Sequence, residues 1–198
     1  MKILRKLYEW VLHWADTPYG PLALFLLALA ESSFFPIPPD PLLIVLCLGA
    51  VKKSWRFAFY TSLASVIGGA IGYLIGFGFW EVADSFFYKY VPGFTEEVFQ
   101  KVMRNFHQYG FWYVFSAGFT PIPYKVFTIA SGVFRLNFPL FLLASTLSRS
   151  LRFFVVAGLF RKFGPEVKGF IDKYFNLLTF LFFLLLIGGF LLVKFLIK

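Results

Sequence analysis

Charged residues are scarce in this chain. Of its 198 residues, only 15% are Asp, Glu, Lys or Arg, while 59% are hydrophobic. A soluble domain carries about 25% charged residues. The shortage excludes an ordinary soluble domain and predicts an integral membrane protein. The first residues also lack the compact apolar run and small-residue cleavage site of a secretory signal, so we expect no cleaved leader.

Residue types that support metal, redox or covalent chemistry are few. The one cysteine, Cys47, has no second thiol for a disulfide and no partners for a metal site. The two histidines, His13 and His107, lie in segments without other candidate ligands. We find no Walker loop, dinucleotide fingerprint or HExxH pair. The sequence therefore predicts no enzyme, no cofactor and no metal site.

We interpret the net charge of +9 as a sign of the chain's orientation in the membrane and not of binding to nucleic acid. In a membrane protein, excess Lys and Arg collect in cytoplasmic loops and near anionic lipid headgroups. Placing the N-terminus in the cytoplasm puts most of these residues on the inner side. We therefore expect a multi-pass protein with a cytoplasmic N-terminus and no nucleic-acid partner.

Long apolar runs supply the membrane spans. Residues 57–80 and 175–193 contain no charge. Each is about as long as the roughly 20 residues that cross a bilayer. Residues 136–160 form a further predicted span, and this span carries Arg149 and Arg152.

Two other apolar segments, 20–51 and 110–133, are interrupted by prolines. The interrupting residues are Pro36, Pro38 and Pro39 in the first segment, and Pro121 and Pro123 in the second. Proline ends a helix because it removes a backbone donor and clashes with the preceding turn. We expect each segment to be a re-entrant hairpin that enters and leaves on one side. Broken backbone at that depth must be buried in protein or line a wet cavity.

The two halves repeat one order of elements: a Tyr-Gly pair, an apolar stretch, Pro-Ile-Pro, a second apolar stretch and a span. The expected fold is an all-α integral membrane protein with two inverted repeats, in a single membrane domain over 1–198. Its parts are an amphipathic surface helix at 1–17, repeat one at 19–80, an interfacial linker helix at 82–108, repeat two at 109–160, and a basic loop with a C-terminal span at 161–198. One repeat crosses the membrane an odd number of times, so the second is upside down and the hairpin tips meet near the midplane.

Five charged residues lie at membrane depth: Glu31, Asp40, Lys125, Arg149 and Arg152. Ionisable groups inside hydrocarbon usually mark a binding site or a pathway. Three cations against two acids leave one positive charge, and a proton on Glu31 leaves two, which matches a phosphate dianion. The sequence therefore predicts that these residues bind a substrate and protons.

Each of these residues also has a structural interpretation. Glu31 either exchanges protons or ties an arginine across the bundle. Asp40 either caps the helix that follows it or handles substrate and protons. Lys125 either joins the site or extends its amine to the interface. Arg149 and Arg152 share one helical face and suit a phosphate or carboxylate, or they only neutralise the two acids.

These motifs resemble the DedA family, also called the SNARE-associated or VTT-domain family, and in particular its YqaA-like branch. The resemblance covers about residues 19–160. It rests on Glu31 followed by Pro-Ile-Pro-Pro-Asp40, on Gly118-Phe-Thr-Pro-Ile-Pro-Tyr-Lys125, and on the order of hairpins and spans. It implies a prokaryotic plasma-membrane protein with inverted re-entrant hairpins.

The resemblance also implies a function and one departure from the family. Family members are linked to movement of polyprenyl phosphate or phospholipid across the bilayer and to the proton-motive force. They commonly carry two arginines around the second hairpin's proline. Here the first of these positions is Gly118 and the second is best matched by Lys125. Arg149 and Arg152 are candidates for the missing positive charge.

Three functions follow from these observations. The first is a proton-coupled transporter or flippase for a lipid phosphate, with membrane lipids and protons as partners. The second is a proton-coupled antiporter of an ion or small solute. The third is a non-transporting membrane assembly factor whose charges only hold the bundle together. The sequence leaves self-association into a homo-oligomer open.

Overall fold

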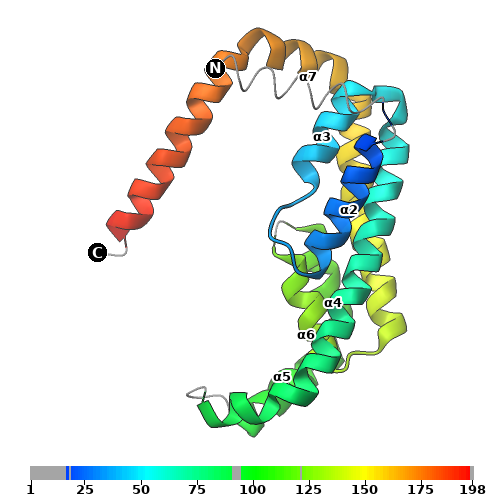
Figure 1. Cartoon of the computed structure of the whole chain (residues 1–198), viewed down its shortest axis with the longest axis vertical. Coiled ribbons are helices and arrows are strands. Elements are labelled where there is room, and N and C mark those ends of the chain that lie inside the picture. Colours follow the sequence, from blue (N-terminus) through cyan, green and yellow to red (C-terminus); the bar gives the residue numbers. More distant parts are fainter. Residues whose placement is uncertain (1–16, 18, 91–94, 121, 197–198) are drawn as a thin grey trace.

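All elements that the structure describes are helices. The computed structural model in Figure 1 describes residues 17, 19–90, 95–120 and 122–196, and these contain no strand. The elements are α2 (Tyr19–Ser33), α3 (Asp40–Gly49), the 3-10 turn η1 (Val51–Lys53), α4 (Ser54–Tyr90), α5 (Glu96–Phe119), α6 (Tyr124–Val133) and α7 (Phe138–Leu196). The all-helical class is confirmed for these residues. The amphipathic helix expected at 1–17 lies almost entirely outside them.

Helices end at both proline-containing breaks. α2 ends at Ser33, where the backbone amides of Phe34 and Phe35 both donate to the Ala30 carbonyl at 2.9 and 2.8 Å. The chain is then non-helical until Asp40 begins α3. α5 ends at Phe119 and α6 begins at Tyr124, directly after Pro123. Pro121 lies outside the described residues.

Three other expected breaks are absent. α4 (Ser54–Tyr90) runs through the expected boundary between repeat one, ending at residue 80, and the linker helix expected from residue 82. α5 is one helix of 24 residues that joins the expected surface segment to the expected first arm of the second hairpin. Gly110 does not end it, because a single glycine is tolerated inside a helix. Its missing side chain instead makes room for Leu136, whose Cδ2 lies 2.9 Å from where a Cβ would stand.

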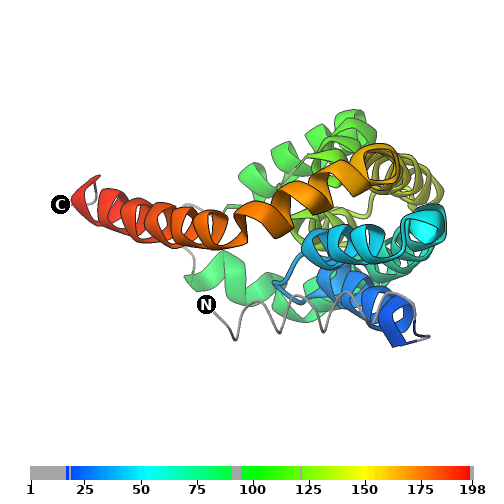
Figure 2. The ribbon, with the colours of Figure 1, turned by 90° about the horizontal axis from the view of Figure 1, so that it is seen from above.

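The basic stretch 161–173, expected to be a loop, is also helical, as part of the 59-residue helix α7. Lys and Arg indicate exposure to water, but they are good helix formers and do not end a helix. The expected C-terminal span at 175–193 is helical within α7 as well. Figures 1 and 2 show this last part of α7 leaving the bundle.

Two helix pairs pack against the two long helices α4 and α7. We call α2 with α3 the first pair and α5 with α6 the second pair. α2 and α6 pack mainly on α4, whereas α3 and α5 pack mainly on α7. In Figure 1, α4 and the first part of α7 run in opposite directions, and the two pairs point their tips at each other.

Glycines on α4 allow this close packing. A Cβ at Gly76 would overlap the Ile129 carbonyl of α6. A Cβ at Gly72 would overlap the Thr128 hydroxyl of α6 and would lie 3.3 Å from the Ser32 carbonyl of α2. One small-residue face of α4 therefore holds an arm from each helix pair, as small residues do between membrane helices.

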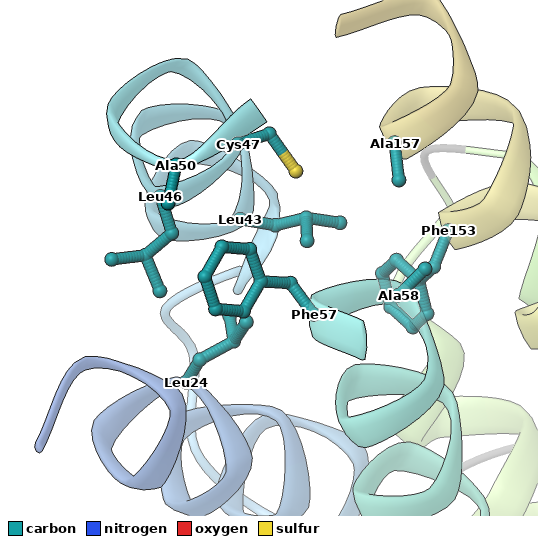
Figure 3. Packing of buried hydrophobic residues seen from close by; sticks show 9 residues of the cluster. All are labelled: Leu24, Leu43, Leu46, Cys47, Ala50, Phe57, Ala58, Phe153 and Ala157. Atoms are coloured by element: carbon teal, nitrogen blue, oxygen red, sulfur yellow. The ribbon is translucent and has the colours of Figure 1, made fainter. Parts of the chain in front are cut away.

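Two apolar cores lie at different levels of the bundle. The first joins α2, α3, α4 and α7 through residues that include Leu24, Leu43, Leu46, Cys47, Phe57 and Phe153 (Figure 3). The second joins α4, α5, α6 and α7 through Tyr73, Val114, Tyr124, Leu136 and Phe141. On α4, Ser65 lies midway between Phe57 and Tyr73, about 12 Å from each at 1.5 Å per residue. The level between the cores is thus left to polar groups.

The distribution of polarity is the reverse of that in a soluble protein. Buried polar side chains are Ser32, Ser33, Ser54, Thr61, Ser62, Ser65, Thr128, Ser131, Ser145, Ser148 and Arg149. Large exposed side chains of α4 and α7 include Phe59, Leu63, Ile67, Leu74, Leu143, Leu147 and Leu151. By length and composition, Val51–Trp80 and Phe138–Gly164 are candidate spans, with mean hydropathies of 1.6 and 1.5. An extended apolar exterior of this kind fits a membrane protein.

Candidate functional site

One cavity gathers all five of the predicted charged residues. It has a volume of about 250 Å³ and lies where the tips of the two helix pairs meet. Its lining consists of Glu31, Pro36, Pro38, Asp40, Thr120, Ile122, Pro123, Lys125, Arg149 and Arg152. A larger, open hollow of about 640 Å³ lies along the first turns of α5, away from these charges.

The proline breaks explain why these residues meet. Glu31 lies in the last turn of α2, Asp40 in the first turn of α3 and Lys125 in the first turn of α6. α2 therefore ends at the cavity, and α3 and α6 begin there. Arg149 and Arg152 come from the first part of α7 (Phe138–Leu196), three residues apart and so on one face. The cavity receives the N-termini of α3 and α6, whose dipoles favour negative charge, and the C-termini of α2 and α5, whose dipoles favour positive charge.

Glu31 and Arg149 form a buried ion pair. The Arg149 Nη2 lies 2.9 Å from Glu31 Oε2, and the side chains are 4% and 13% exposed. Arg149 Nε donates to the Ser65 hydroxyl at 2.5 Å. The Ser32 and Ser65 hydroxyls are themselves 2.6 Å apart. This network links α2, α4 and α7.

Aromatic rings hold the same guanidinium on two sides. The Arg149 Cζ lies 4.7 Å from the centre of the Tyr124 ring and 4.6 Å from that of Phe153. Such stacking is attractive because the ring face is negative, and more so away from water. Arg149 is therefore fixed by a carboxylate, a hydroxyl and two rings.

Asp40 and Arg152 form a second pair that is more open. Arg152 Nε and Nη2 lie 3.1 Å from Asp40 Oδ1 and 3.0 Å from Oδ2, and the side chains are 20% and 19% exposed. Arg152 Nη1 also donates to the carbonyls of Phe119 and Thr120, at 3.2 and 2.8 Å. Arg152 thus joins both tips and satisfies carbonyls at the end of α5.

The capping alternative for Asp40 is wrong. Asp40 is the first residue of α3, and the capping position belongs to Pro39, with no side-chain cap hydrogen bond. The carboxylate has both oxygens on Arg152 instead. A fork of two parallel charge-assisted bonds is stronger than one bond to a backbone amide.

Lys125 differs from the two arginines. Its Nζ donates to the Phe35 carbonyl at 3.1 Å, so it too joins the second tip to the first. No carboxylate pairs with it among the residues that the structure describes. Since each arginine has its own acid, the surplus positive charge of the cavity lies on Lys125.

The absence of a side chain at Gly118 leaves space for Ser148 and Arg149 of α7. A Cβ at Gly118 would overlap the Ser148 hydroxyl and would lie 3.5 Å from Arg149 Cδ. A side chain at 118 is therefore incompatible with this arrangement of α7. Positive charge at this point of the cavity comes from α7 instead of α5.

Several groups of the site were missed from sequence. Ser32, Ser65, Tyr124 and Phe153 hold the charges in place, and Thr120 lines the cavity. Ser32 directly follows Glu31, which is a weak signal. Ser65 lies among the small residues of α4, where close packing of helices is the more direct explanation of a serine. Tyr124 and Phe153 give no sequence signal among so many aromatic residues.

Comparison with known proteins now assigns the family. Residues 35–162 match the VTT domain, which is the domain of the DedA family. The chain belongs to the VTT-domain family. This membership suggests a transporter-like membrane protein, in agreement with the apolar exterior. No solved structure matches the chain.

Relatives of this VTT-domain protein occur in bacteria and archaea. The chain is 39% identical to an uncharacterised protein of Haemophilus influenzae over 168 residues, which cover 80% of this chain and 81% of that protein. It is 35% identical to an uncharacterised protein of Histophilus somni over 159 residues, or 80% and 82% of the two chains. It is 29% identical to an uncharacterised protein of Methanocaldococcus jannaschii over 135 residues, or 68% and 79%.

Proposed function

We propose that this VTT-domain protein moves a lipid phosphate, either polyprenyl phosphate or a phospholipid, across a prokaryotic inner membrane in a proton-coupled step. The observation that carries the proposal is the charge balance of the cavity. Two acids neutralise two arginines, and Lys125 adds a positive charge that has no carboxylate partner among the described residues. An anionic group is the natural ligand of such a cavity.

The arrangement of the helices supports two inverted re-entrant repeats. Each long helix packs with the first arm of its own half and the second arm of the other half. The halves run in opposite directions, and their tips meet between two apolar cores (Figure 1). In a bilayer, the tips would lie near the midplane, in a multi-pass protein with a cytoplasmic N-terminus.

The size of the cavity suits a headgroup and not a whole lipid. At about 250 Å³ it is smaller than the roughly 300–1,000 Å³ of sites that enclose drug-sized ligands. The phosphate would take up the remaining donors of Lys125 and the N-termini of α3 and α6. The hydrocarbon tail would stay in the bilayer, against the apolar exterior.

Protonation of an acid would raise the positive charge. When Asp40 takes up a proton, the cavity gains one unit of charge and Arg152 loses an ionic partner. The cavity then matches a phosphate dianion. Glu31 offers the same chemistry behind Arg149, in a more enclosed position. Proton and phosphate binding are thereby coupled through the ion pairs.

A reconstitution experiment tests the proposal. Protein in vesicles is given labelled undecaprenyl phosphate, and its movement between leaflets is followed with and without a pH gradient. We expect movement that the gradient changes, loss in Lys125→Gln and retention in Lys125→Arg. Lys101→Gln is the matched control, because Lys101 is an exposed cation on α5 far from the cavity.

Other outcomes select other functions. Proton or cation flux without lipid movement would identify an antiporter. Normal lipid movement in Glu31→Gln, Asp40→Asn and Lys125→Gln would leave the charges with a structural role only. We further propose that the protein is no enzyme, so mass spectrometry should recover the lipid phosphate chemically unchanged after transport.

A further inference from the structure

An apolar groove lies between the first turns of α2 and α4, on the outside of the bundle. It has a volume of about 390 Å³, and its described lining consists of Pro21, Leu22 and Phe25 of α2 and Tyr60 of α4. Leu22 is 54% exposed and Tyr60 is 40% exposed. None of these residues lines the cavity at the tips, so the two sites are separate. We call this one the outer groove.

The two helices that form the outer groove begin at the same end of the bundle. Leu24 of α2 packs in one apolar core with Phe57 of α4 (Figure 3). Further along, a Cβ at Gly68 of α4 would overlap the Leu29 carbonyl of α2. α2 and α4 thus run side by side in the same direction, as Figure 1 shows. The outer groove therefore lies near the start of both helices.

Positive charge gathers at this end of the bundle. The exposed cations there are Lys52, Arg56, Arg161 and Lys162. Arg161 Nη1 donates to the Lys52 carbonyl at 3.1 Å, which brings the cations of α7 beside those at the start of α4. The described acid nearest to them in the chain is Glu166. Arg56 is four residues before Tyr60, so it lies one turn above the groove on the same face of α4.

The depth of Arg56 matches that of a lipid headgroup. Arg56 is nine residues before Ser65, so it lies about 14 Å along α4 from the level where the tips meet. With the tips at the midplane, the edge of the hydrocarbon core is about 15 Å away. Tyr60 lies about 6 Å deeper than Arg56, and tyrosine is enriched at this boundary because its ring is apolar and its hydroxyl is polar. Charge, hydroxyl and apolar surface therefore follow one another as in a lipid molecule.

An anionic phospholipid suits these features better than other occupants do. The volume of the groove falls within the roughly 300–1,000 Å³ of sites that hold a small molecule, whereas a protein partner requires about 800 Å² of surface. No carboxylate pairs with Arg56 among the residues that the structure describes. A phospholipid supplies both an apolar chain for the groove and a phosphate for the guanidinium. A net negative headgroup is favoured further by the cations around Arg56.

We propose that the outer groove binds an acyl chain of an anionic phospholipid, whose phosphate binds Arg56 beside Lys52. The inference rests on the membrane arrangement of the proposed function but not on transport, because this lipid lies outside the cavity at the tips. It would be a resident lipid of the leaflet that surrounds the start of α4.

Photo-crosslinking tests this site. A benzoyl-phenylalanine replaces Leu22 in the full chain, which is reconstituted in vesicles of phosphatidylcholine with a minority of phosphatidylglycerol. After irradiation, mass spectrometry identifies what is attached at this position. We expect phosphatidylglycerol adducts enriched at least about fivefold over the vesicle composition, the effect of one cation near a membrane surface. The same group in place of Leu147, exposed on α7, should react in the proportion of the vesicle lipids.

Variants of Arg56 test the headgroup contact. Arg56→Gln should lower the enrichment about fivefold, and Arg56→Lys should keep it because the charge remains. Lys101→Gln, on exposed α5, is the matched control and should change nothing. Adducts in the proportion of the vesicle lipids overturn the proposal, as do adducts with a second chain or with residues 1–16, or an enrichment that Arg56→Gln leaves unchanged. Lys125→Gln should keep the enrichment while lipid movement falls, so this proposal and the proposed function fail separately.

Discussion

The two acid–arginine pairs of the cavity look alike in sequence but differ in their surroundings. Arg149 is 4% exposed, stacks between two rings and binds a hydroxyl as well as Glu31. Arg152, one turn further along α7, is 20% exposed and binds Asp40 and two carbonyls of the opposite tip. The first pair fastens α7 to α2 and α4, while the second fastens the two tips to each other.

Because of this difference in exposure, we expect one pair to contribute mainly to stability and the other mainly to function. A buried pair that loses one partner leaves an uncompensated charge, which is strongly destabilising. A partly exposed pair is solvated when it opens and so exchanges partners at less cost. We therefore assign Glu31–Arg149 mainly to holding the bundle. Under the proposed function, Asp40–Arg152 and Lys125 would take part in the changes that accompany substrate binding.

The largest effect on stability is expected from Arg149→Ala. The change leaves Glu31 buried without its partner and should lower the free energy of unfolding by about 3–5 kcal/mol. Unfolding in mixed micelles, followed by tryptophan fluorescence, measures this. The double variant Arg149→Met with Glu31→Gln should regain part of the loss. Equal losses in the single and double variants would show that the pair does not hold the bundle.

A smaller loss is expected from Arg152→Ala. Four charge-assisted contacts disappear, but water reaches the site, so the loss should be about 1.5–3 kcal/mol. Lipid movement should stop because the tips separate. Arg152→Lys keeps the charge but not the two-pronged contact with Asp40, and it should restore stability only in part. If Arg152→Ala destabilises as much as Arg149→Ala, the two pairs are equivalent.

Lys125→Gln should leave the free energy of unfolding within about 0.5 kcal/mol of the original value. Its one bond, to the Phe35 carbonyl, can be replaced by the new amide. The rate of lipid movement should fall about tenfold or more, since a charge-assisted contact to phosphate is lost. Lys125→Arg serves as the control and should retain movement. A large loss of stability in Lys125→Gln would contradict the role given to Lys125.

The smallest expected difference concerns salt. Raising the ionic strength from about 0.1 to 1 M shortens the screening length from about 10 to 3 Å. The destabilisation caused by Asp40→Asn should shrink by a few tenths of a kcal/mol, because its pair is partly exposed. The destabilisation caused by Glu31→Gln should not change with ionic strength. An equal response of both variants would remove the distinction between an open and an enclosed pair.

Much of the site was predictable because its residue types are rare in apolar surroundings. Glu31, Asp40, Lys125, Arg149 and Arg152 were each identifiable as charges at membrane depth, and all five line one cavity. The partners were not predictable. Nothing in the spacing says that Glu31 meets Arg149 and not Arg152, because the choice depends on how α2, α3 and α7 lie in space.

The ends of the helices were also only partly predictable from the sequence. Prolines marked the breaks after α2 and α5, since proline acts locally on the backbone. Gly110 and the basic run 161–173 predict helix boundaries, yet both lie inside helices. Whether a glycine or a group of charges ends a helix depends on the residues packed around it. Gly110 is needed for the contact with Leu136.

The sequence by itself determined that the chain is helical, mainly apolar and broken at two proline-rich points, because composition and backbone chemistry act locally. Only the tertiary structure decided which acid pairs with which arginine, which cation keeps its charge unpaired, and where hydroxyls lie between the long helices. Those outcomes depend on distances between residues far apart in the chain, and such distances are set by packing.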